Sequence, residues 1–281
     1  MELSTLTIEL TQRQFEKISS LVYDLCGINL HIGKKELVKA RLNKRLRQLG
    51  ISDFDEYLAF LASDTSGREL VDMLDAISTN LTSFFREPAH FEYLSKQILP
   101  RLVQERGRDP GRRLRIWSAG CSSGEEPYTI AIVLRNEIEN LDRWDAAILA
   151  TDINTRMLDT ARCGEYAEAR LKNMPVQVQS RCFECIESKK PRVYRARPEI
   201  RRLVSFARLN LLDNWPMRGN FDVIFCRNTM IYFDKPTQGK LVRRFREKLN
   251  EGGVLFIGHS ESLTGIKHDF DYVQPTVYRR A

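Results

Sequence analysis

The segment from Arg115 to Glu126, read as R-I-W-S-A-G-C-S-S-G-E-E, constrains the fold more than any other part of the chain. An apolar strand runs into a turn that contains Gly120 and Gly124, and a helix follows directly. Glycines lack the Cβ atom that would keep a ligand away from the backbone, and the first N–H groups of a helix face whatever lies in the turn. This strand, turn and helix therefore predict a binding site for a small ligand.

Acidic side chains around this turn indicate the kind of ligand. Glu125 and Glu126 open the helix, and carboxylates at that position disfavour a polyphosphate and favour a cation. A second apolar strand over 146–150 ends in Thr151 and Asp152, where an acidic residue binds ribose hydroxyls in dinucleotide folds. A ribose that carries a positive amino group or a sulfonium describes S-adenosylmethionine. The sequence therefore predicts S-adenosylmethionine as the cofactor.

Composition excludes several classes of protein. The chain has 281 residues, of which 42% are hydrophobic and 29% charged, as is ordinary for a globular protein of one or two domains. No window approaches the ~20 apolar residues of a membrane span, and the N-terminus does not have the pattern of a signal peptide. The sequence thus predicts a cytoplasmic protein without direct membrane insertion, and the lack of a coiled-coil pattern makes a monomer the expected state.

Cysteine and histidine positions do not indicate a metal. The six cysteines are scattered, which is typical of reduced thiols rather than of a disulfide framework. Cys182 and Cys185 form one C-x-x-C pair, but a second pair or a nearby histidine would be needed for a zinc site. The histidines show no ligand spacing and lie at His31, His90, His259 and His268. We therefore expect no metal.

The N-terminal part of the chain has the pattern of an all-helical domain. Thr11 and Gln14 form a capping box before an apolar stripe with helical spacing, and Gly27 supplies a C-terminal stop. A basic helix follows, Ser52 is the expected cap of a third helix, and 70–77 form a fourth. These elements predict a small bundle of four helices.

Most of the positive charge lies in the second of these helices. The net charge is +7, and seven basic residues lie between Lys34 and Arg47 against Glu36 alone. A charge run of this kind is usually a solvated helix face, and the alternative is a docking surface for an acidic partner, either nucleic acid or an acidic protein helix. The candidate docking residues are Arg41, Lys44, Arg45 and Arg47.

From residue 114 onward, predicted strands and helices alternate. The predicted strands cover 114–118, 146–150, 203–209, 221–226 and 254–257, and the helices 127–136, 154–162 and 237–249. Such alternation predicts a mostly parallel, doubly wound sheet whose ligand lies beyond the carboxyl ends of the strands. We expect 272–280 to add one edge strand. Residues 164–202 exceed the length of a simple crossover and form either a partner-binding insertion or a solvated loop.

Four motifs, taken in order, resemble a known family. They are T-N-L-T-S-F-F-R-E at 79–87, W-S-A-G-C-S-S-G-E-E-P-Y at 117–128, F-D-V-I-F-C-R-N-T-M-I-Y-F-D at 221–234 and G-H-S-E at 258–261. Together they resemble the chemoreceptor glutamate methyltransferases, the CheR family, over almost the full chain. The resemblance implies an α/β fold with a Rossmann-like class I methyltransferase domain at 86–281. It also implies an all-helical substrate-docking domain at 1–85 and a small inserted β-subdomain at about 164–202.

The resemblance implies an activity and its partners. Members of this family transfer the methyl group of S-adenosylmethionine to glutamate side chains of methyl-accepting chemoreceptors, which forms methyl esters and S-adenosylhomocysteine. The implied partner is the acidic methylation region in the receptor's cytoplasmic part, and no nucleic acid is involved. Some members bind a receptor's C-terminal tail peptide through the insertion, often with a Gly-rich turn. Cys185 to Pro191 replace that turn here, which weakens the case for tail-peptide binding.

The resemblance also implies site residues. The implied cofactor contacts are Asn80, Thr82, Arg86, Gly120, Glu125 or Glu126 with Glu126 favoured, Asp152, Asn210, Leu211, Arg227 and Asn228. The implied catalytic residues are Arg86 and Tyr232, near the transferred methyl group. The alternative roles are an interdomain ion pair for Arg86, a core position for Tyr232 and a helix cap for Asp152.

The chemistry needs no general base, and two competing functions are weaker. A glutamate with a pKa near ~4.3 is ionised at neutral pH, so the enzyme has only to orient and desolvate it, with Arg86 and Tyr232 as the guiding groups. A nucleic-acid methyltransferase would fit the positive charge, but the segment 227–231 lacks the Pro-Pro-aromatic turn common in enzymes that methylate base amino groups. A noncatalytic adaptor is disfavoured by the intact set of site residues.

Overall fold

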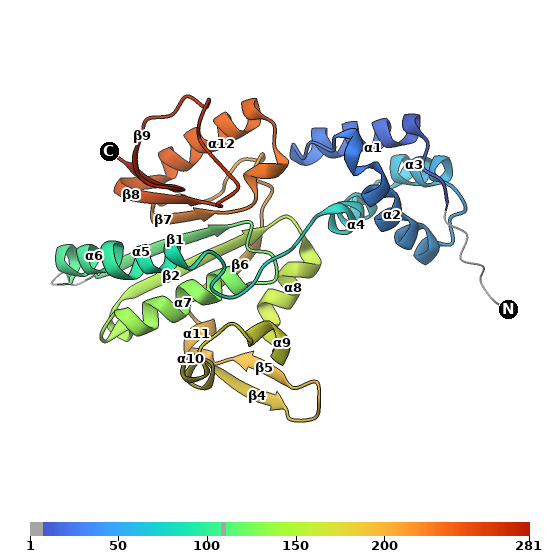
Figure 1. Ribbon diagram of the computed structural model, residues 1–281. Helices are drawn as coiled ribbons and strands as arrows, with labels where there is room; N and C mark the ends of the chain where they lie inside the picture. The colour runs from blue at the N-terminus through green and yellow to red at the C-terminus, as the bar shows by residue number, and fades with distance from the viewer. Residues whose placement is uncertain (1–7, 108–110) are drawn as a thin grey trace.

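The computed structural model describes residues 8–107 and 111–281. Helices at the N-terminus form a body beside a large central sheet, and a small second sheet lies below the central sheet in this view (Figure 1). The N-terminal helices are α1 (Gln12–Cys26), α2 (Lys35–Leu49), α3 (Phe54–Ser63) and α4 (Arg68–Ile77), with a short 3-10 turn at Ile32–Lys34. The predicted all-helical domain is thereby confirmed.

Local capping explains where these helices begin and end. The Thr11 side chain accepts from the backbone of Gln14, whose side chain accepts from Thr11 in return, so the predicted capping box is present. Gly27 ends α1 with a φ of 71°, as predicted. The prediction for α3 was wrong by one residue. Asp53 is the cap, because its carboxylate accepts from the backbone N–H groups of Asp55 and Glu56, whereas Ser52 bonds to the side chain of Glu56.

A linker joins the helical domain to the domain that contains the central sheet. After α4, residues 78–87 run without regular structure across the front of the sheet, and α5 (Pro88–Tyr93), a π-helical turn (Leu94–Ile98) and α6 (Leu99–Arg106) follow (Figure 1). These helices lie outside the predicted elements. The spacing of Phe91, Leu94, Ile98 and Leu102, all of them buried, is the helical signal that identifies them.

The central sheet has the order β6-β2-β1-β7-β8-β10-β9. Its strands are β1 (Arg113–Ala119), β2 (Asp145–Asp152), β6 (Val204–Arg208), β7 (Phe221–Cys226), β8 (Leu249–Ile257), β9 (Phe270–Gln274) and β10 (Val277–Arg280). The first five in sheet order run parallel, as predicted, and β10 is antiparallel to β8. The prediction of a single edge strand over 272–280 was wrong. The chain reverses at Thr276, which has a φ of 64°, and forms two paired strands.

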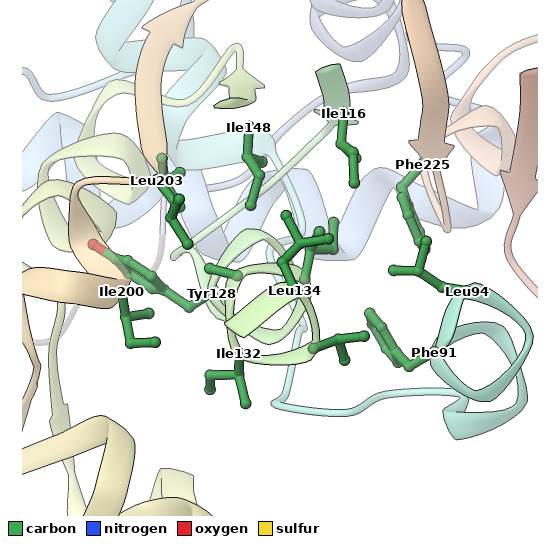
Figure 2. Close-up of a cluster of buried hydrophobic side chains, with 14 of the residues drawn as sticks. Phe91, Leu94, Ile116, Tyr128, Ile132, Leu134, Ile148, Ile200, Leu203 and Phe225 are labelled. Carbon is green, nitrogen blue, oxygen red and sulfur yellow. The ribbon is translucent and has the colours of Figure 1, made fainter. Parts of the chain in front are cut away.

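Helices cover both faces of the sheet. They include α5 and α6 together with α7 (Glu125–Glu137), α8 (Thr155–Cys163) and α12 (Lys235–Lys248). Two 3-10 turns lie at Leu141–Arg143 and Met230–Tyr232. Figure 2 shows one face, where Ile116, Ile148 and Phe225 of the strands lie over Tyr128 and Leu134 of α7. All six residues of β7 are buried, which is the pattern of a central strand covered on both sides.

The insertion between α8 and β6 forms the small second sheet. Its elements are β3 (Glu165–Ala167), α9 (Glu168–Leu171), α10 (Val176–Cys182), β4 (Phe183–Glu187), β5 (Val193–Ala196) and α11 (Pro198–Arg201). The three strands are antiparallel in the order β3-β5-β4, so the expected inserted β-subdomain is present. Within the described residues, no helix has both the length and the apolar character that a membrane crossing requires.

Candidate cofactor site and active site

A pocket opens where the carboxyl ends of four strands meet. The turns after β1, β2, β6 and β7 converge there, as expected for a doubly wound sheet. They contribute Gly120, Ser122, Asp152, Ile153, Leu209, Asn210, Leu211, Arg227, Asn228 and Thr229 to the lining. All of the cofactor residues proposed from the sequence line this pocket except Glu125, and Tyr232 lines it as well.

The Gly-rich turn packs its backbone closely against neighbouring side chains. Gly120 has a φ of 89°, and a Cβ there would lie 2.3 Å from the hydroxyl oxygen of Thr229. Gly124 has a φ of 95°, and its Cβ would lie 2.8 Å from Ala161 of α8. Because side chains at either position would be strained and crowded, the turn depends on glycine.

A buried network of charges forms the floor of the pocket. Glu126 accepts a hydrogen bond of 2.7 Å from the hydroxyl of Ser118 and one of 2.9 Å from Arg227 Nη1. Arg227 also donates from Nη2 to Glu87, at 3.0 Å, and its side chain is only 2% exposed. The guanidinium is therefore held between two carboxylates.

Burial and charge act in opposite directions on these carboxylates. Burial raises the pKa of Glu126, and Arg227 only partly offsets this. Burial also acts to raise the pKa of Glu87, but Arg227 and the surrounding donors outweigh it and hold that pKa below its ordinary value. Glu87 consequently provides the anionic partner that keeps Arg227 in place.

Glu125, next to Glu126, faces a different part of the molecule. Its carboxylate is fully buried, and it bonds to the hydroxyl of Ser123 at 2.7 Å and to Arg170 of the inserted subdomain. Because α7 turns successive side chains apart, only Glu126 of the two carboxylates reaches the pocket.

Asp152 lies at the end of β2 with both carboxylate oxygens engaged. Oδ2 accepts from the backbone N–H of Ser122 at 2.7 Å, and Oδ1 accepts from that of Asn154 at 2.9 Å. Burial raises the pKa of Asp152, and these backbone donors oppose the rise. The cap of α8 is Asn154, which accepts from Met157 N, so Asp152 is not the helix cap. It couples the Gly-rich turn to the end of β2.

Arg86 and Tyr232 lie at the mouth of the pocket and contact the same linker. Arg86 donates to the carbonyl of Leu81 at 2.7 Å, and its side chain is 33% exposed. The hydroxyl of Tyr232 donates to the carbonyl of Thr79 at 3.4 Å. Neither residue is a core group, and the guanidinium of Arg86 lies 4.0 Å from Glu87.

Two carboxylates that position the site were not among the predicted residues. Glu261 accepts from the backbone N–H groups of Asn228 at 2.9 Å and of Ile231 at 3.2 Å, and thereby fixes the turn after β7. Glu87 accepts from the side chain of Asn228 at 3.3 Å. Asn228 has a φ of 56°, a strained conformation that these bonds hold in place. Both carboxylates belong to the family motifs at 79–87 and 258–261, which is the signal that could have identified them.

The helical domain also lines the pocket, which the sequence did not predict. Its contributions are Cys26, Ile28, Asn29, Leu30, Lys34, Leu37, Val38 and Ile77. The two domains approach closely at Gly27, where a Cβ would lie 2.4 Å from Leu212. Asn210 donates to the carbonyl of Leu25 at 2.8 Å, and Asn29 donates through its backbone to Tyr232 at 2.8 Å. No local pattern reveals such contacts, since they depend on how the domains pack.

Comparison with known proteins assigns both domains to the same family. A family model described as "CheR methyltransferase, all-alpha domain" matches residues 13–78, and "CheR methyltransferase, SAM binding domain" matches residues 80–279. The chain belongs to the CheR methyltransferase family. The two matches meet near the start of the linker, whereas the boundary predicted from the sequence is at residue 85.

Relatives of similar length support the same family assignment. A probable chemotaxis protein methyltransferase of Rhizobium etli is 44% identical over 92% of this chain and 96% of its own length. The chemotaxis protein methyltransferase of Borreliella burgdorferi is 40% identical over 98% of this chain and 96% of its own. That of Escherichia coli is 38% identical over 98% and 95%. The similarity therefore includes both domains.

The basic helix of this CheR-family chain differs from its prediction in one respect. Arg45 donates to Glu69 of α4 at 2.9 Å and to Asp72 at 2.8 Å, and its side chain is only 16% exposed. Arg41 donates to the carbonyls of Ile77 and Ser78 at the end of α4. These two cations are therefore used within the domain, and only Lys44 and Arg47 of the predicted docking set are exposed.

Proposed function

We propose that this chain transfers the methyl group of S-adenosylmethionine to glutamate side chains in the cytoplasmic part of chemoreceptors. The observation that carries this proposal is the single pocket that joins a buried acidic floor to an arginine and a tyrosine at its mouth. The names of the relatives, all chemotaxis protein methyltransferases, support the same activity. The products are a glutamate methyl ester and S-adenosylhomocysteine.

Within this proposal, the pocket floor binds the charged and hydroxylic parts of the cofactor. Each oxygen of Asp152 accepts one backbone hydrogen bond, and since a carboxylate has about four lone-pair sites, it can still accept from ribose hydroxyls. Glu126 supplies negative charge for the methionyl amino group. Asn210 and Leu211 border the adenine, with the Cys26–Leu30 side of the helical domain above them.

The transfer is a direct displacement. An oxygen of the substrate carboxylate forms a bond to the methyl carbon while the carbon–sulfur bond breaks and its electron pair remains on sulfur. The substrate is already ionised at neutral pH, so no base has to remove a proton. Arg86 guides the incoming carboxylate and the Tyr232 hydroxyl orients it, and well-held geometry of this kind lowers a barrier by several kcal/mol, up to roughly ten.

The receptor binds across the helical domain. Lys44 and Arg47 are exposed on α2 and attract an acidic helix, while Lys34 and Leu37 of the same region line the pocket. We propose a monomer that recognises receptor helices and no nucleic acid. Binding of a receptor tail peptide by the inserted subdomain stays a prediction, as does the cytoplasmic location.

The deciding experiment follows the label from the cofactor. The purified chain is incubated with methyl-labelled S-adenosylmethionine and a cytoplasmic receptor fragment from the same cell, and the product is treated with mild alkali. We expect labelled methanol, because a glutamate methyl ester is alkali-labile. Alkali-stable label would indicate nitrogen or carbon methylation and would overturn the proposal. Arg86→Ala is the matched variant, and it should bind the receptor fragment without labelling it.

A further inference from the structure

Three potential metal ligands lie together beside the pocket without lining it. Glu87, His90 and His259 each offer one ligand atom, and these atoms all lie within 4.8 Å of one another. His90 is buried at 1% exposure, whereas the side chain of His259 is 51% exposed. The cluster therefore has a closed side and a side open to solvent.

Only one ring nitrogen of His90 has a hydrogen-bond partner among the described residues. Nε2 of His90 and the hydroxyl oxygen of Thr276 lie 2.6 Å apart. The other ring nitrogen is Nδ1. This Nδ1 atom is buried and has no hydrogen-bond partner among the described residues, which calls for an explanation in a native site.

Nδ1 faces a carboxylate. Oε2 of Glu87 lies 3.6 Å from Nδ1, beyond hydrogen-bonding distance. A cation bound between these two atoms would give both of them a partner.

The spacing of the ligand atoms fits a small tetrahedral ion. Two ligands at 2.0–2.1 Å from such an ion are roughly 3.4 Å apart, and Nδ1 and Oε2 lie 3.6 Å apart. Nε2 of His259 lies 4.0 Å from the same oxygen, and this exposed ring has room to move closer. Two histidines and a glutamate are a donor set that zinc uses, with a fourth position left open.

We propose that Glu87, His90 and His259 form a binding site for Zn²⁺ or a similar transition-metal ion. Thr276 holds the ring of His90 for the metal, as second ligand shells commonly do. The site departs from the sequence-based expectation of no metal, because His259 is far from Glu87 and His90 in the chain and meets them only where the end of β8 lies beside the start of α5.

The metal competes with Arg227 for Glu87. Arg227 donates to the same oxygen, Oε2, from Nη2 at 3.0 Å and from Nε at 3.3 Å. A cation on that oxygen repels the guanidinium, and Arg227 lines the cofactor pocket. Metal and cofactor should therefore weaken each other's binding, by about fivefold or more for a coupling of ordinary size. This consequence rests on the proposed cofactor site, whereas metal binding itself does not.

Cobalt is a suitable probe because a four-coordinate Co²⁺ ion has intense visible absorption. The full chain carries Cys163→Ser and Cys185→Ser, since these two exposed thiols could bind the metal elsewhere. We expect one Co²⁺ ion per chain. His259→Ala removes one ligand and keeps the backbone N–H that holds Glu87, so it should weaken binding roughly tenfold or more. His31→Ala, an exposed histidine on the helical domain, is the matched control and should change nothing.

The outcomes separate the two claims. Equal Co²⁺ binding by the parent, His259→Ala and His31→Ala variants, or no binding by the parent, overturns the site. His90→Gln is a second variant and should also lose the visible bands, but if it fails to fold, His259→Ala decides alone. The affinity for S-adenosylhomocysteine is then measured with and without Zn²⁺. A fall in the parent that is absent in His259→Ala supports competition with Arg227, and an unchanged affinity in the metal-bound parent overturns that coupling while leaving the site intact.

Discussion

The pocket floor and the basic helix α2 both depend on charge, but they use it differently. In the floor, Arg227 is 2% exposed and lies between Glu87 and Glu126. On α2, Lys44 and Arg47 face solvent. A buried charge costs desolvation and requires fixed partners, whereas a surface charge is screened by salt and free to meet another molecule. The first arrangement fixes geometry and the second attracts a partner.

The same contrast separates the basic residues of α2 into two groups, one used within the domain and one exposed. Arg45 joins α2 to α4 through Glu69 and Asp72, and Arg41 donates to the last carbonyls of α4, where a cation is favourable. The linker that begins there lines the pocket. Half of the predicted docking cations thus stabilise the path of the linker.

The largest expected effect is the loss of the central cation in the floor. Arg227→Ala leaves Glu87 and Glu126 buried without their counter-ion, and removing one partner of a buried pair typically costs about 3–5 kcal/mol. Chemical denaturation should show this loss in the free energy of unfolding. Arg47→Ala removes an exposed cation and should stay within about 0.5 kcal/mol of the parent. Similar losses for the two variants would mean that the floor is not a fixed network.

The second test separates the two carboxylates at the start of α7. Glu126→Gln keeps the shape of the side chain but removes the charge that faces the pocket, so affinity for S-adenosylhomocysteine should fall by about 1.5–3 kcal/mol, the range for a hydrogen bond to a charged group. Calorimetric titration measures this difference. Glu125→Gln is the matched control, because that carboxylate faces Arg170 and Ser123. A larger effect of Glu125→Gln would reverse the assignment.

The same contrast explains what could be read from the sequence. Alternating strands and helices predicted the sheet, and motifs of consecutive residues identified the turns that converge on the pocket, because each is encoded locally. The partners of Arg41 and Arg45 were not predictable, since a helix sequence does not reveal which of its cations meets Glu69 or the end of α4. The role of Cys26, Ile28 and Asn29 in lining the pocket was missed for the same reason, because it depends on contact between domains.

The third test compares two arginines of one helix. Arg45→Ala leaves Glu69, whose side chain is 4% exposed, with the Tyr57 hydroxyl as its remaining partner at 2.8 Å. The cost should be about 1–3 kcal/mol of unfolding free energy, as for a buried polar group that loses its partner. Thermal or chemical unfolding, with Arg47→Ala as the matched variant, measures it. If Arg45→Ala and Arg47→Ala are equally stable, Arg45 is not a structural cation and belongs with the candidate docking residues.

The smallest effect concerns the exposed half of α2. Reversing both free charges, with Lys44→Glu and Arg47→Glu, should raise the KM for a receptor fragment severalfold, or by about 1 kcal/mol, because complementary charge mainly aids encounter. The KM for S-adenosylmethionine should not change, since neither residue lines the pocket. Lys240→Glu and Arg243→Glu, which reverse two exposed charges on α12, are the matched control. The difference between the two double variants should shrink as salt shortens the Debye length below about 10 Å. A difference that is independent of salt would mean that Lys44 and Arg47 act through direct packing, as Arg227 does in the floor. The distinction between the two regions would then fail.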